Sequence, residues 1–185
     1  MDIDNRLVSS TLNGDVHSFS ILVEKYQVDI FNFLFRLTLC REDAEELLQD
    51  VFVRVYKYLY TYNSSMKFSS WLYSIAVNTF KDHFKRKKKQ LAICSFDDEI
   101  NTGVKQTNQL EIDLETREEF REIVKIINSL KEEYRIAIIL KCIQDFSYKE
   151  IGEMLGISPQ NAKMRVNRAR RKIGKSLNKM NGGAF

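Results

Sequence analysis

Two short helices and the turn between them can be placed residue by residue on one stretch of this chain, 147–172, which reads SYKEIGEMLGISPQNAKMRVNRARRK. Ser147 followed three residues later by Glu150 forms a capping box, because the hydroxyl accepts from a free amide and the carboxylate reaches back. A helix is therefore predicted to begin here. Ile151 and Leu155 share one face of it at helical spacing.

A glycine and a proline mark the boundary between the two helices. Gly156 can adopt a positive φ without strain, so it is expected to end the first helix just after Leu155. Ser158 as the N-cap and Pro159 at the first helical position predict a second helix. Its packing stripe is narrow and consists of Ala162, Val166, Ala169 and Ile173. Two helices joined by a tight glycine-containing turn are typical of a helix-turn-helix.

The opposite face of the second helix is polar and basic. Its side chains project together where a DNA major groove would receive them, and they are Gln160, Lys163, Met164, Asn167, Arg168 and Arg171. The stretch 163–179 contains eight Lys or Arg residues and no Asp or Glu. Phosphate is the natural counter-charge for such a segment. A merely solvated helix normally mixes both signs, so we predict that this one binds DNA.

Length and composition favour an all-α protein. The 185 residues suit two small domains, and seven Gly and one Pro accompany apolar residues at helical spacing, so strands are not expected. Cys40, Cys94 and Cys142 lie far apart without a CxxC pair, which indicates reduced thiols and neither a disulfide framework nor a zinc site. The sequence shows no secretory signal pattern and no run long enough to cross a bilayer, so we expect a cytoplasmic location without membrane insertion.

Two amphipathic helices are predicted in the amino-terminal half. The first begins at Asp15 and runs to about Leu39, and the second runs from about Arg41 to about Leu59. One face of the second is densely acidic, with almost no local neutralisation, and carries Glu42, Asp43, Glu45, Glu46, Gln49 and Asp50. This face is either ordinary solvated surface, a docking surface for a basic or polar partner helix, or part of a metal-dependent nuclease site. We favour docking, since complementary charge steers and registers association. The nuclease is disfavoured because no second acidic cluster is evident to complete a two-metal site.

The segment 68–89 is predicted to form a helix that is aromatic early and strongly basic late, after a loop at 63–67. Aromatic side chains can stack on unpaired bases while Lys and Arg follow the phosphates, which is how single-stranded nucleic acid is held. The alternative treats the cations as solubilising surface and places four residues in a helical core: Trp71, Leu72, Ile75 and Thr79. This segment alone does not decide between the two.

Helical periodicity fades between about Leu91 and Arg117, where the charge also reverses. Nine acidic residues minus three basic ones between Asp97 and Glu122 leave six net negative charges. We therefore predict a flexible acidic linker at 91–116, between a domain of residues 1–90 and a domain of residues 117–185. In the second domain, a helix opening at Ser129 or Leu130 is predicted to support the helix-turn-helix through Tyr134, Ala137, Ile138 and Cys142.

Three segments, taken together and in order, resemble an extracytoplasmic-function sigma factor of bacterial RNA polymerase, the minimal two-domain group of the sigma-70 family. They are DAEELLQDVFVRVY at 43–56, FSSWLYSIAVNTFKDHFKR at 68–86 and LKEEYRIAIILKCIQDFSYKEIGEMLGISPQNAKMRVNRARRKI at 130–173. The likeness covers nearly the whole chain. It implies an initiation factor that binds core polymerase, directs it to promoters through their −35 and −10 elements and assists promoter melting. No catalytic residue, metal or cofactor is implied, because polymerase performs the chemistry.

The resemblance also implies roles for particular positions. The β′ clamp helices of polymerase would be bound by Asp43, Glu46, Leu47, Gln49, Asp50 and Phe52, and the β flap is a further expected contact. The −10 element would be recognised and opened by Asn63, Ser64, Lys67, Trp71, Asn78, Lys81, Asp82, Lys85 and Arg86. The −35 element would be bound by Gln160, Asn161, Lys163, Met164, Arg165, Asn167, Arg168 and Arg171. An anti-sigma factor, commonly membrane-anchored in this family, is expected as a further partner.

Some positions depart from the family pattern. Gly152 and Ala162 stand where Ala and Val are usual, so the two short helices are expected to pack either more loosely or more closely. Met164 offers no strong hydrogen bond, and the −35 sequence is therefore not predicted. Two other functions stay open at this point. One is a stand-alone regulator that binds duplex DNA through 147–172, and the other is a metal-dependent enzyme that uses the carboxylates of 42–50.

Overall fold

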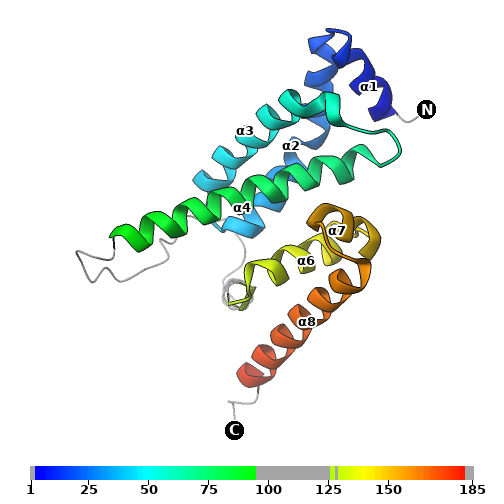
Figure 1. Cartoon of the computed structure of the whole chain (residues 1–185). Coiled ribbons are helices and arrows are strands. Elements are labelled where there is room, and N and C mark those ends of the chain that lie inside the picture. Colours follow the sequence, from blue (N-terminus) through cyan, green and yellow to red (C-terminus); the bar gives the residue numbers. More distant parts are fainter. Residues whose placement is uncertain (1–2, 95–125, 128, 182–185) are drawn as a thin grey trace. The chain divides into compact units, whose positions relative to one another are not determined.

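The computed structural model describes residues 3–94, 126–127 and 129–181, and side chains within these ranges except at 88–94 and 179–181. All regular elements in the described ranges are α-helices or a 3-10 helix, and no strand occurs there, which confirms the all-α prediction. The chain divides into two compact units, 1–106 and 107–185 (Figure 1). Most of the predicted linker at 91–116 lies outside the described residues, and its boundaries stay a prediction.

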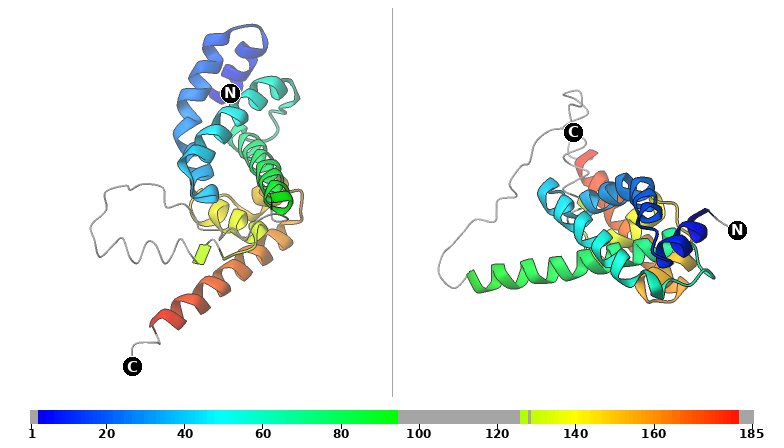
Figure 2. Two further views of the ribbon diagram at one scale, coloured as in Figure 1. Left: turned by 90° about the vertical axis from the view of Figure 1, so that its left-hand side faces the viewer. Right: turned by 90° about the horizontal axis from the view of Figure 1, so that it is seen from above.

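The amino-terminal unit is a bundle in which α2 packs against α1, α3 and α4, and α3 also packs against α4. Its elements are α1 (Ile3–Leu12), α2 (Val16–Thr38), α3 (Arg41–Tyr58), the 3-10 turn η1 (Leu59–Thr61) and α4 (Phe68–Cys94). Its fully buried large side chains include Leu22, Ile30, Phe33, Leu34, Leu37, Leu47, Phe68, Leu72 and Phe80. Helix α4 continues past the predicted end at Lys89, and its last turns project beyond α2 and α3 (Figures 1 and 2).

Helix α2 begins and ends where the sequence predicts. The Asp15 carboxylate accepts hydrogen bonds from the His17 amide at 3.0 Å and from Ser18 Oγ at 2.6 Å. The bond from Ser18 is the main reason that the pKa of Asp15 lies below its ordinary value. At the other end Leu39 adopts a left-handed conformation with φ of 55°, and its amide donates to the Phe35 carbonyl.

Helix α1 is not predicted by the sequence analysis. Its inward positions are Asp4, Val8 and Thr11, so only one of the three buried residues is apolar. Asp4 is 4% exposed, and its carboxylate accepts hydrogen bonds from Lys25 Nζ and Tyr26 Oη of α2. A buried carboxylate is tolerated only when it is paired in this way, so α1 is attached to α2 by polar contacts as well as by Val8.

The carboxy-terminal unit contains α6 (Glu132–Cys142), α7 (Tyr148–Leu155) and α8 (Pro159–Asn181), and α8 packs on both of the others. Helix α6 begins at Glu132, shortly after the predicted start at Ser129 or Leu130, with Lys131 as its N-cap. The apolar core between the three helices includes Ile136, Ile139, Leu140, Ile151, Met154, Ala162, Val166 and Ala169. Met154 is buried whereas Leu155 is only half-buried, so the inward face of α7 is Ile151 with Met154.

The predicted capping of the helix-turn-helix is confirmed atom by atom. The Ser147 amide donates to Glu150 Oε2 at 2.8 Å, and the Glu150 amide donates to Ser147 Oγ at 3.2 Å. Gly156 ends α7 with φ of 64°, a conformation that side chains disfavour. Ser158 Oγ then accepts from the Asn161 amide at 3.2 Å, which caps the start of α8.

Gly152 explains how closely the two helices of this motif approach. A Cβ atom built at Gly152 would lie 2.7 Å from the Ile157 carbonyl oxygen and 3.3 Å from the Pro159 nitrogen. Both neighbours are backbone atoms, so a side chain here requires the turn or the start of α8 to move. Of the two outcomes left open by the sequence, the structure shows the closer packing.

We expect Gly152→Ala to destabilise the carboxy-terminal unit by about 1–3 kcal/mol, since it overpacks a backbone contact. Gly174→Ala is the matched control, because a Cβ at Gly174 meets no atom within 4 Å in the described structure. That change should be neutral or stabilise α8 by about 0.5–1 kcal/mol through helix propensity. Hydrogen exchange of the amides in α6, α7 and α8 measures both effects, and equal protection in the two variants would contradict the close approach.

Candidate nucleic-acid interface

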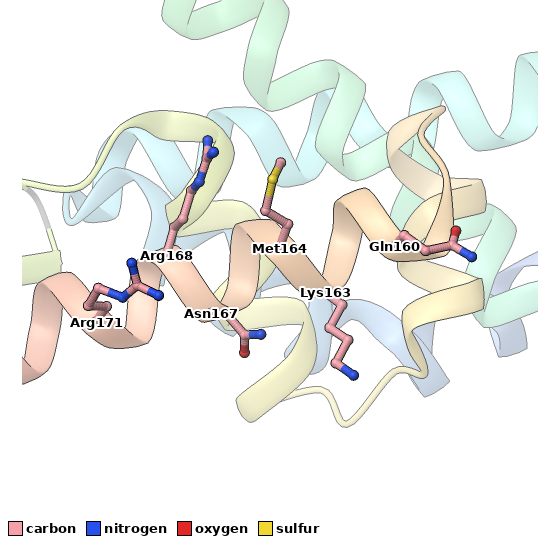
Figure 3. Close-up of a pocket in the computed structure, with 6 residues that line it drawn as sticks. All are labelled: Gln160, Lys163, Met164, Asn167, Arg168 and Arg171. Atoms are coloured by element: carbon pink, nitrogen blue, oxygen red, sulfur yellow. The ribbon is translucent and has the colours of Figure 1, made fainter.

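The outward face of α8 forms the first part of the candidate interface. All six residues predicted to face outward are exposed and line one shallow depression: Gln160, Lys163, Met164, Asn167, Arg168 and Arg171. Figure 3 shows Met164 and Arg168 pointing to one side of the helix and Lys163 and Asn167 to the other. The two further residues implied for the −35 element are not among those that line this depression; Asn161 is exposed and Arg165 is half-buried.

Helix α6 holds the side of α8 that faces it. Glu133 Oε2 lies 3.1 Å from Arg165 Nη2, which forms an ion pair. Arg168 Nη1 donates to the Tyr134 hydroxyl at 3.1 Å, and Lys172 Nζ lies 5.8 Å from the centre of the Tyr134 ring. These contacts bring three cations of α8 to two neighbouring residues of α6.

Two other arginines of this unit lie in or against α6: Arg135 belongs to α6, and Arg170 of α8 contacts its last residue. Arg135 is buried, and the loss of solvation lowers its pKa, although the nearby Glu132 carboxylate acts in the opposite direction. Arg170 Nη2 lies 3.5 Å from the exposed Cys142 thiol, and this hydrogen bond raises the pKa of Arg170. Both guanidinium groups are charged at neutral pH, because arginine stays protonated in proteins.

The aromatic start of α4 packs with the preceding loop in the amino-terminal unit. Tyr62, Phe68 and Trp71 form a cluster with ring centroids 5.5 to 5.8 Å apart. Trp71 is 9% exposed, and Leu72 and Thr79 are fully buried. The structure therefore shows the core packing of these residues, and a role of Trp71 in stacking on bases stays a prediction.

A tyrosine links α1 to the loop implied for the −10 element. The Tyr62 hydroxyl lies 2.7 Å from Asn5 Oδ1 and 2.8 Å from the Met66 carbonyl oxygen, so its one hydrogen is shared between two acceptors. Within the loop, Asn63 Oδ1 accepts from the Ser65 amide at 2.9 Å. The unpredicted helix α1 thus supports this loop through Asn5.

The polar residues implied for the −10 element occupy the loop and one face of α4. Asn78, Asp82, Lys85 and Arg86 are exposed, Lys81 is half-buried, and the loop residues Asn63, Ser64 and Lys67 are exposed. Asp82 Oδ2 accepts from Arg54 Nη1 of α3 at 2.9 Å. This ion pair offsets the one carboxylate that the resemblance places among the DNA contacts.

The acidic face of α3 is more neutralised than the sequence suggests. Asp43 forms an ion pair with Lys87 of α4 and lies 3.8 Å from His83 Nε2, while Glu45 pairs with Arg41 at 2.7 Å. The prediction of almost no local neutralisation is therefore wrong at these two acids. The Asp43 pair was missed because Lys87 is far away in sequence and meets Asp43 only through the packing of α3 on α4. The Glu45 pair is local, since Arg41 lies one helical turn before it, and the i,i+4 spacing could have predicted it.

The six residues implied for polymerase binding are not equally accessible. Glu46 and Gln49 are exposed, Asp43, Asp50 and Phe52 are half-buried, and Leu47 is fully buried. Leu47 lies in the bundle core, so it supports this surface from below and presents no area to a partner. Next to the acidic face, the Cys40 thiol donates to Glu42 Oε2 at 3.1 Å. That bond lowers the pKa of Glu42, and burial raises the pKa of Cys40.

Two negative findings apply to the described part of the chain. None of its His, Cys, Asp and Glu residues form a group of three or more that could hold a metal ion. None of its helices is both long and apolar enough to span a bilayer. Cys40 and Cys142 are free thiols, and the side chain of Cys94 lies outside the described residues.

We expect Tyr62→Phe to loosen the 63–67 loop, because it removes the hydroxyl that joins Asn5 to Met66. The Met66 amide, which donates to the Asn63 carbonyl at 3.1 Å, should exchange faster, and the unit should lose about 0.5–1.5 kcal/mol of stability. Tyr60→Phe is the control, since Tyr60 is 71% exposed. Unchanged exchange at Met66 in Tyr62→Phe would show that the hydroxyl does not order the loop.

Two family models match this chain, and together they cover more than half of it. Sigma-70 region 2 matches residues 22–90, and sigma-70 region 4 matches residues 120–173. Both units of the structure are therefore represented, in the order expected from the sequence.

Curated relatives match almost end to end. The RNA polymerase sigma factor YlaC of Bacillus subtilis (strain 168) is 32% identical over 165 residues, which is 88% of this chain and 93% of that protein. The ECF RNA polymerase sigma-E factor of Escherichia coli (strain K12) is 30% identical over 177 residues, 92% of each chain. The ECF RNA polymerase sigma factor SigW of Bacillus subtilis (strain 168) is 28% identical over 179 residues, 92% of this chain and 94% of that protein.

Solved structures share the fold. The structure of CnrH in complex with the cytosolic domain of CnrY gives a TM-score of 0.72 at 21% identity, over 96% of this chain and 99% of that one. The sigma factor RpoE of Bartonella quintana, solved in complex with the anti-sigma factor NepR, gives a TM-score of 0.69 at 21% identity, over 86% of this chain and 96% of that one. At this level of identity the likeness is one of fold.

Proposed function

Since this chain belongs to the extracytoplasmic-function group of the sigma-70 family, we propose that it binds core RNA polymerase and directs it to promoters through their −35 and −10 elements. The observation that carries this proposal is the presence of both family regions, in order, on one chain whose region 4 unit exposes a basic helix face.

The −35 element is read by α8 in the major groove. Arg168 and Lys163 carry donors suited to guanine O6 and N7, and the amide of Asn167 suits adenine N6 and N7. Arg171 lies on the same exposed face and suits either a base or a phosphate. Met164 contributes apolar contact, for which the methyl group of thymine is the natural partner.

The −10 element is held by the 63–67 loop and the exposed face of α4. Asn78, Lys85 and Arg86 point away from the core, so amide and cationic groups are available to a single strand and its phosphates. Asp82 contributes little repulsion because Arg54 pairs with it. Strand opening follows from capture of an unpaired base at this loop, which stabilises the melted state relative to the duplex.

Polymerase docks on α3, where Glu46, Gln49 and Asp50 suit the polar and basic side chains of the β′ clamp helices. The carboxy-terminal unit meets the β flap. The chain has no catalytic role of its own, acts in the cytoplasm, and is held inactive by an anti-sigma factor, which competes for surfaces of the kind that polymerase uses.

Transcription in vitro with purified core polymerase tests the proposal. We expect the chain to confer initiation at specific sites on a template from its own genome, and the core alone to give none. Dependence on holoenzyme that is already saturated with another sigma factor would identify a stand-alone regulator instead. Metal-dependent cleavage of DNA by the chain alone would identify an enzyme.

We expect Glu46→Lys to weaken binding to core polymerase about tenfold, equivalent to about 1.4 kcal/mol, because it places a cation where positive charge is expected to dock. Glu24→Lys changes the net charge equally on the exposed side of α2 and should have little effect. Titration of fluorescently labelled chain with core polymerase measures both. Equal affinities of the two variants for core polymerase would show that the docking surface does not lie on α3.

A further inference from the structure

Three cations on one side of α8 share a fixed relation to α6. Arg165, Arg168 and Lys172 follow one another at spacings of three and four residues, so they form a single stripe along the helix. Glu133 contacts the first of them and Tyr134 contacts the other two. None of the sequence motifs or family regions assigns a role in DNA reading to these two residues of α6.

Glu133 and Tyr134 affect the charge of the arginines that they contact in different ways. Glu133 carries a full negative charge 3.1 Å from Arg165, so that arginine is neutralised and has less attraction left for phosphate. The Tyr134 hydroxyl is neutral and accepts one N–H bond from Arg168. A guanidinium has five N–H donors, so Arg168 keeps its charge and four donors after making this bond.

Tyr134 is a rigid anchor because it is 8% exposed and belongs to the core between α6 and α8. An exposed arginine samples many rotamers, and holding it in one rotamer for a bidentate contact costs side-chain entropy. A hydrogen bond to a fixed hydroxyl restricts those rotamers before DNA arrives. Arg168 nevertheless remains exposed and lines the depression on α8, so its remaining donors are accessible (Figure 3).

We propose that Tyr134 is a positioning residue for −35 recognition, whose hydroxyl orients the Arg168 guanidinium toward one base pair while Tyr134 itself does not contact DNA. This inference rests on the proposed function. It adds that the preference at the base pair read by Arg168, for which guanine is the expected partner, is set from α6 and not by α8 alone.

The test uses the full-length chain bound to core polymerase and a pool of randomised duplex DNA, with the bound fraction sequenced. Arg168→Ala identifies the affected base pair by flattening the preference there. Tyr134→Phe keeps the ring beneath Lys172 and removes only the hydroxyl, so it should reduce the preference at that same base pair about three- to tenfold. The other positions and the dependence of binding on salt should not change, because no charge is lost.

Tyr148→Phe is the matched control, since Lys141 Nζ lies 5.7 Å from the Tyr148 ring much as Lys172 does from Tyr134. It should leave every preference intact. If Tyr134→Phe retains the full preference at the base pair of Arg168, or weakens all positions equally, the positioning role is overturned and Tyr134 is only a packing residue. If the wild-type complex enriches no sequence, the proposed function fails, and this inference fails with it.

A second measurement uses the wild-type chain without DNA, so it does not depend on whether a variant folds. Nuclear magnetic resonance relaxation of the arginine Nε–Hε groups in the wild-type chain should show Arg168 more restricted than Arg171, which lies on the same exposed face. Equal mobility of the two side chains would overturn the anchoring by Tyr134.

Discussion

The carboxy-terminal unit depends on burial of a narrow stripe of small residues, because α8 can present cations to DNA only if little of its circumference is used for packing. Ala162, Val166 and Ala169 are fully buried, and they are short enough to let α8 lie close to α6 and α7. The rest of the helix carries the positive charge. Helix α6 holds part of that charge in place through Glu133 and Tyr134, so the exposed face has a defined arrangement before any ligand is present.

The amino-terminal unit combines an apolar core with polar connections at its edges. Asp4 attaches α1 to α2, and Tyr62 attaches the 63–67 loop to α1. Two ion pairs, Arg54 with Asp82 and Asp43 with Lys87, join α3 to α4. The surface proposed to bind polymerase, on α3, and the surface proposed to bind DNA, on α4, are therefore joined by packing and by side-chain ion pairs.

The features that were predictable from the sequence are local ones. The capping box of Ser147 and Glu150, the left-handed Gly156 and the outward face of α8 involve residues within a turn or two of each other, so spacing and residue type were sufficient. Contacts between distant segments were not predictable. Helix α1 was missed because two of its three inward residues are Asp4 and Thr11, which break the apolar pattern. The neutralisation of Asp43 likewise depends on how α3 and α4 pack. The burial of Trp71 was one of two alternatives in the sequence, and the packing of the loop against α4 decides it.

Gly152 shows how a residue that lies away from the face of α8 proposed to bind DNA can constrain the position of that helix. Its absent methyl group allows the Ile157 carbonyl and the Pro159 nitrogen to approach the backbone of α7. Pro159 is the first residue of α8, so the close approach at Gly152 constrains where α8 starts relative to α7. A chain with alanine in place of Gly152 would have to position α8 differently, so equivalent residues along the two α8 helices would project in different directions.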